Sequence, residues 1–74
     1  MSIEAFIAPG SFDPEVTRLM GEAFDAVCEY IGPSKPPQVY EDAALRILDA
    51  VRRGERDPLL LRAAALDPRP HNVA

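Results

Sequence analysis

The sequence predicts an all-α fold, a small three-helix domain with helices at about residues 14–31, 38–53 and 58–66. Apolar residues recur three and four positions apart along these stretches, which is the period of a helix and not of a strand. Proline and glycine stand where such helices begin and end. A chain of 74 residues is expected to form one domain, residues 1–74. Because a chain this short buries only about 60 to 65% of the surface its unfolded form exposes, contact with a partner would add to a thin margin of stability.

Residues 1–11 precede the first helix and alternate weakly between apolar and polar, as a strand would. A lone strand does not make a sheet, and no second strand is predicted to pair with it. We therefore expect an extended arm over residues 1–11 that lays Phe6, Ile7 and the following Phe12 on the helices. In a dimer this arm would reach the neighbouring copy or pair with its own counterpart.

The first helix, at 14–31, is predicted to begin at Asp13-Pro14, an acidic capping residue followed by a proline. It ends at Gly32-Pro33. Gly21 lies inside it and costs roughly 1 kcal/mol relative to alanine, either because another backbone approaches closely or because the cost is simply tolerated. The apolar stripe of this helix contains Val16, Leu19, Met20, Ala23, Phe24, Val27, Cys28 and Ile31.

The second helix, at 38–53, follows a proline-rich connection that allows the chain to turn back. On its polar side, Asp42 with Arg46 and Asp49 with Arg53 are acid-then-base pairs four residues apart, which stabilise a helix by a few tenths of a kcal/mol each. Gly54 follows where a left-handed residue is needed to end the helix. The buried stripe is predicted to contain Tyr40, Ala43, Ala44, Ile47, Leu48 and Val51.

The third helix, at 58–66, contains three consecutive leucines, whose side chains must point in three directions. One face cannot bury all three, so some must meet the N-terminal arm or a second molecule. Residues 67–74 show no periodicity and are predicted to be a frayed tail. The residues predicted to form an interface between two copies are Phe24, Leu59, Leu60 and Leu61.

Charge and cysteine content indicate a cytoplasmic chain. The net charge is −4, with −6 over residues 1–45 and +2 over residues 46–74, so the two halves could attract each other within one chain or between subunits. A single cysteine, Cys28, cannot form an intrachain disulfide and fits a reducing compartment. No leader-like segment or apolar run of membrane-spanning length occurs, so we expect neither export nor membrane insertion.

No catalytic, cofactor-binding or metal-binding set is recognisable, so the chain is not expected to be an enzyme. The only histidine, His71, lies in the tail, and Cys28 lies on the apolar stripe of the first helix. A nucleophilic cysteine would need a base within hydrogen-bond reach in a cleft. The carboxylates are spread along polar faces and are not clustered as metal ligands are.

The second helix, the corner after it and the third helix have the outline of a helix-turn-helix. Leu59 to Leu66, however, offers only Arg62 to base edges, and a chain of net charge −4 is repelled by phosphates. The competing interpretation is a polar corner made of Glu55, Arg56 and Asp57. In that corner Asp57 caps the third helix, and Arg56 pairs with Glu55 or with an acid of the first helix. The arginines available to a nucleic-acid function are Arg46, Arg52, Arg53, Arg56 and Arg62.

The run from Arg46 to Pro58, together with Phe12–Glu15 and Ala23–Ala26, resembles a group of short uncharacterised bacterial helical proteins. The resemblance covers about residues 12–66, and its most distinctive part is Gly54-Glu55-Arg56-Asp57-Pro58. It implies no activity, cofactor or partner, and therefore assigns no role to any residue.

From the residues alone, the leading hypothesis is a small interaction or regulatory module that acts as a homodimer and presents a helical surface to a protein partner. The alternative is a nucleic-acid-associated regulator that uses the arginines of the second and third helices. An enzyme, or a subunit of one, is the third hypothesis.

Overall fold

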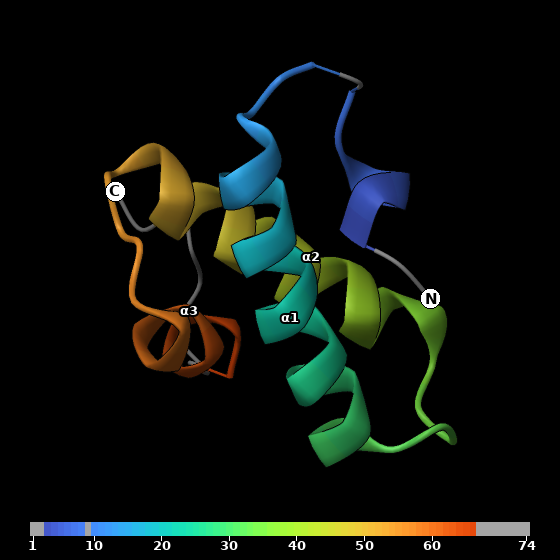
Figure 1. Cartoon of the computed structure of the whole chain (residues 1–74). Helices are drawn as coiled ribbons and strands as arrows, with labels where there is room; N and C mark the ends of the chain where they lie inside the picture. The colour runs from blue at the N-terminus through green and yellow to red at the C-terminus, as the bar shows by residue number, and fades with distance from the viewer. Residues whose placement is uncertain (1–2, 9, 67–74) are drawn as a thin grey trace, which may run out of the picture.

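The computed structural model describes residues 3–8 and 10–66, and all regular secondary structure within them is helical (Figure 1). The three α-helices confirm the predicted fold class, and each boundary lies within one residue of the predicted position. The elements are the 3₁₀ turn η1 (Ile3–Phe6) and the helices α1 (Pro14–Ile31), α2 (Pro37–Arg52) and α3 (Pro58–Ala65). The predicted tail at 67–74 lies outside the described residues.

The core lies where the three helices meet, and the predicted stripes of α1 and α2 supply most of it. Phe24 on α1, Ile47 on α2 and Leu61 on α3 are each 0% exposed. Burial of such side chains is the main favourable contribution to folding. The remaining buried residues are Ile3, Met20, Ala23, Val27, Tyr40, Ala43, Ala44, Leu48, Val51 and Ala65.

The N-terminal segment differs from the extended arm that the sequence predicts. Residues Ile3–Phe6 form a 3₁₀ turn, in which the Ile7 N–H donates to the Glu4 carbonyl at 3.4 Å. Without a neighbouring strand, a turn lets the segment satisfy a backbone group locally while Ile3 becomes buried. The ring of Phe6 packs edge-on against that of Phe24, with centroids 5.8 Å apart. The arm therefore does cover the helices, but as a turn.

Contacts of η1 are with α1 and α2 and not with α3. Figure 1 shows η1 and α3 at opposite sides of the α1–α2 pair. The sequence predicts that either the N-terminal arm or a second molecule covers the leucines of α3. The 3₁₀ turn does not cover them.

The end of α2 is a two-bond cap built on Gly54, as predicted. Gly54 has φ of 101°, a conformation that residues with a side chain rarely adopt. The Glu55 N–H donates to the Ala50 carbonyl at 3.0 Å, and the Gly54 N–H donates to the Val51 carbonyl at 2.9 Å. This pair of bonds is the Schellman pattern, and it turns the chain sharply toward α3.

Helix starts use the two Asp-Pro pairs differently. The Asp57 carboxylate accepts a hydrogen bond from the Leu59 N–H at 2.9 Å, which confirms that Asp57 caps α3. Asp13 stands at the equivalent place before α1, but its side chain makes no capping hydrogen bond. At α1 the start therefore depends on Pro14 and on the extended conformation of Asp13.

The structure leaves room for a side chain at Gly21. A methyl group at position 21 would lie 3.9 Å from Cγ2 of Ile3, an ordinary van der Waals distance. Within the described residues, no backbone of another segment comes within 4 Å of that methyl position. Close backbone approach therefore does not explain this glycine.

Candidate interaction surface

Helix α3 is apolar on its outer side as well as on its inner side. Leu61 and Ala65 point into the core, whereas Leu59, Leu60 and Leu66 are 62%, 51% and 42% exposed. A surface helix normally carries polar residues opposite its buried stripe. The only charged residue of α3 is Arg62. We call the exposed side the α3 face, and define it by Leu59, Leu60, Ala63 and Leu66.

Two of the four predicted interface residues do not lie on this surface, so the prediction for Phe24 and Leu61 is wrong. Both are 0% exposed. The N-terminal turn covers Phe24. Of the three consecutive leucines, Leu61 is the one whose side chain faces α1 and α2. Each of the three leucines has an alanine four residues later on its own face of the helix, so the sequence contains no local signal that singles out Leu61 as the buried one.

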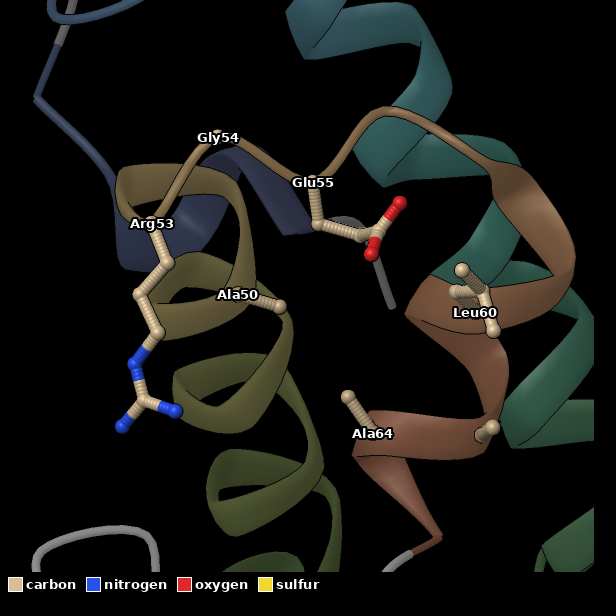
Figure 2. Close-up of a pocket in the computed structure, with 7 residues that line it drawn as sticks. Ala50, Arg53, Gly54, Glu55, Leu60 and Ala64 are labelled. Carbon is tan, nitrogen blue, oxygen red and sulfur yellow. The ribbon is translucent and has the colours of Figure 1, made fainter.

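Beside the α3 face, between the end of α2 and α3, lies an open groove of about 470 Å³ (Figure 2). Its walls carry small or apolar side chains, Ala50 on α2 and Leu60 and Ala64 on α3. Figure 2 shows the Glu55 carboxylate directed from the corner toward Leu60 and Ala64, while Arg53 extends away on the other side of α2. The sequence did not predict this groove, because it depends on the angle at which α3 leaves the corner.

The polar corner is held by bonds from side chains to the backbone. The Arg56 guanidinium donates to the carbonyls of Val51 at 2.9 Å and of Glu55 at 2.8 Å. The Glu55 carboxylate accepts from the N–H groups of Arg56 and Asp57, both at 3.1 Å. The predicted ion pair of Arg56 with an acid is therefore replaced by carbonyl contacts, because the last carbonyls of α2 have no partner within the helix.

Two further arginines near the corner also have protein partners. Arg53 pairs with Asp49 at 2.7 Å, as the sequence predicts. Arg46 was expected to pair with Asp42, but its Nη1 donates to the Ala65 carbonyl at 3.4 Å. A cation there lies at the negative end of the α3 dipole. With Arg56, three of the five arginines considered for nucleic-acid contact thus have partners within the protein, although only the Arg46 contact joins α2 to α3.

Cys28 is half-buried on α1, and burial raises the pKa of its thiol, with the nearby Asp25 carboxylate adding to the increase. A raised pKa leaves little of the nucleophilic thiolate at neutral pH. His71 lies outside the described residues. No group of three metal-ligand side chains gathers in the part of the chain that the structure describes.

No helix among the described residues is long and apolar enough to cross a membrane. Comparison of the chain with protein-family models, with curated proteins and with solved structures gives no match. The resemblance to short bacterial helical proteins accordingly stays a prediction, and the proposals below depend on the geometry of α3 and the corner.

Proposed function

We propose that this chain is a cytoplasmic interaction module that associates with a second copy of itself through the α3 face. The observation that carries the proposal is the exposure of Leu59, Leu60 and Leu66 on, and directly after, a helix whose only charged residue is the half-buried Arg62. An eight-residue helix is not stable alone and depends on packing. Here packing within one chain covers only Leu61 and Ala65 fully.

The order of residues on the α3 face favours a second copy as the occupant. Leu59, Ala63 and Leu66 follow one another at spacings of four and three, so they lie along one line of the helix. Read in reverse, this large-small-large order is the same. Two antiparallel α3 helices related by a two-fold axis would therefore place Leu59 of each copy against Leu66 of the other, with the two Ala63 residues at the axis. Self-complementarity of this kind is the requirement for a two-fold interface.

The proposed dimer is weak. An α3 helix of eight residues is about 12 Å long, so its outer face is smaller than the roughly 800 Å² per partner of a standard stable interface. We expect a dissociation constant on the order of 0.1 mM. Weak association suits a module that exchanges partners.

Sedimentation equilibrium from about 10 µM to about 1 mM tests the proposal, with half-dimerisation expected on the order of 0.1 mM. The double variant Leu59→Glu/Leu66→Glu places like charges against one another across the axis and is expected to remain monomeric. Leu45→Glu is the matched control, because Leu45 is an exposed leucine of α2 outside the α3 face. Wild-type protein that stays monomeric throughout, or a Leu45→Glu variant that loses the dimer equally, would refute the proposal.

The nucleic-acid alternative has less support. Three of its five arginines already have partners within the protein, and the helix that would enter a groove presents leucines. The Leu59→Glu/Leu66→Glu variant also tests this alternative. If the wild-type protein binds duplex DNA weakly and the variant loses that binding together with dimerisation, both activities use the α3 face.

A further inference from the structure

The groove between α2 and α3 contains one fixed negative charge. Oε2 of Glu55 accepts from two backbone N–H groups, those of Arg56 and Asp57, at 3.1 Å each. These bonds hold the carboxylate in place and occupy both lone pairs of that oxygen. The second oxygen, Oε1, has no hydrogen-bond partner among the described residues, and Figure 2 shows the carboxylate facing the groove.

Among the described residues the Glu55 carboxylate has no ion pair, and the neighbouring Arg56 guanidinium donates to the Val51 and Glu55 carbonyls instead. Ala50, Leu60 and Ala64 line the groove with carbon. Arg53 also lines the groove, but its guanidinium pairs with Asp49 at 2.7 Å and points away from Glu55 (Figure 2). The site thus has an apolar trough that ends at a single carboxylate oxygen.

We propose that this groove binds a lysine side chain from a segment of a partner protein. The four-carbon stem of lysine lies over Ala50, Leu60 and Ala64, and its ammonium donates to Oε1 of Glu55. Lysine commonly buries its stem along apolar surface while its charge remains near water. The groove shares Leu60 and Ala63 with the α3 face, so peptide binding and the proposed self-association compete, and binding is measured at about 10 µM protein, well below the expected dissociation constant of the dimer.

The state of Glu55 favours lysine over arginine. Arginine binds a carboxylate best through two parallel bonds, one to each oxygen. One oxygen of Glu55 is already saturated by the backbone, so only a single-point contact is available. A compact ammonium makes such a contact without leaving half of a planar fork unpaired.

The test is an NMR titration of ¹⁵N-labelled protein with the peptide acetyl-Leu-Lys-Leu-amide, and with matched peptides that carry arginine or glutamine in the centre. We expect saturable shifts at Glu55, Leu60 and Ala64 with the lysine peptide, and affinities about tenfold lower with glutamine. Equal affinity for the glutamine peptide would overturn the proposal, since the charge would then contribute nothing. Tighter binding of the arginine peptide would overturn the preference for lysine.

Glu55→Gln separates charge from folding, because the amide oxygen can still accept from the two N–H groups. This variant is expected to keep its helical circular-dichroism spectrum and to bind the lysine peptide about tenfold more weakly. Glu41→Gln removes an exposed carboxylate elsewhere on α2 and should leave binding unchanged. An unaltered affinity in Glu55→Gln, or an equal loss in Glu41→Gln, refutes the site.

A final variant distinguishes an external partner from a second copy. The chain has one lysine, Lys35, in the connection between α1 and α2. If Lys35 of another copy already filled the groove, Lys35→Gln protein would bind the peptide more tightly than wild type, and the external partner would be ruled out. Unchanged affinity, measured at a protein concentration at which the chain is monomeric, supports the proposal.

Discussion

Helices α2 and α3 adjoin the same corner but differ in how completely one chain covers them. α2 buries Tyr40, Ile47, Leu48 and Val51, among others, and exposes mainly polar residues such as Glu41 and Arg52 on other sides, with Leu45 at 38% exposure. α3 buries Leu61 and Ala65 and exposes leucines. A helix with one apolar stripe is complete within its own domain, whereas a helix apolar on two sides needs a second contact.

The two sides of α3 therefore differ in what they contribute. The inner side stabilises the fold through few residues, while the outer side contributes little to the folded monomer and is the side that we propose for binding. Substitutions on the inner side of α3 should therefore lower the stability of the fold, whereas substitutions on its outer side should weaken association.

The largest expected effect comes from the inner side. Leu61→Ala should lower the free energy of unfolding by about 3 kcal/mol, because it removes a leucine that is 0% exposed and leaves a cavity. Leu60→Ala, at 51% exposure, should cost less than about 1 kcal/mol. Urea unfolding of monomeric protein at low concentration measures both. Similar losses in the two variants would show that the two sides of α3 do not differ as described.

The helix starts provide a second, smaller contrast. Asp57→Ala should cost about 1 kcal/mol, since it removes the hydrogen bond from Asp57 to the Leu59 N–H that begins α3. Asp13→Ala is the matched control and should cost only a few tenths of a kcal/mol, because Asp13 makes no such bond at α1. Thermal or urea unfolding measures the pair. A larger loss at Asp13 would mean that α1, and not short α3, depends more on its cap.

Stability can also be gained on the well-covered side of the molecule. Gly21→Ala in α1 should raise the free energy of unfolding by about 0.5 to 1 kcal/mol, because alanine favours the helix and its methyl group meets only Ile3 at 3.9 Å. Gly54→Ala should instead destabilise the fold, since φ of 101° is strained for alanine. A destabilised Gly21→Ala variant in urea unfolding would indicate that η1 packs more tightly on α1 than the structure shows.

The sequence predicted the helices and most of the core because period and end signals are local. The stripe on α2 from Tyr40 to Val51 could be assigned residue by residue, and Asp57 and Gly54 marked the corner. The side of α3 that faces inward could not be assigned, since three adjacent leucines offer three directions and a distant helix decides among them. Phe24 was wrongly predicted to lie at an interface because the N-terminal turn that covers it is distant from it in the sequence.

The candidate groove could not be predicted from the sequence, for a different reason. Glu55 and Ala64 are nine positions apart, and they share a groove only because the cap on Gly54 sets the direction of the chain after α2. Arg56 was likewise expected to pair with an acid, but its guanidinium donates to the Val51 carbonyl, which also accepts from the Gly54 N–H. Local signals predict which groups need partners, whereas the turn geometry decides which partners they find.

The smallest expected effect concerns Cys28, on the flank of the covered core. Because burial raises its pKa, the folded thiol stays protonated at pH values where an unfolded chain has begun to ionise. Stability from this group is thus complete below the pKa of a free cysteine and is lost as pH rises through the folded pKa. Iodoacetamide alkylation should be slower than for the chain in urea, with its rise displaced to higher pH. If the alkylation rate of the folded protein rises at or below the pH found in urea, the thiol is not buried as the structure shows. Helix α1 would then present a reactive side chain to solvent.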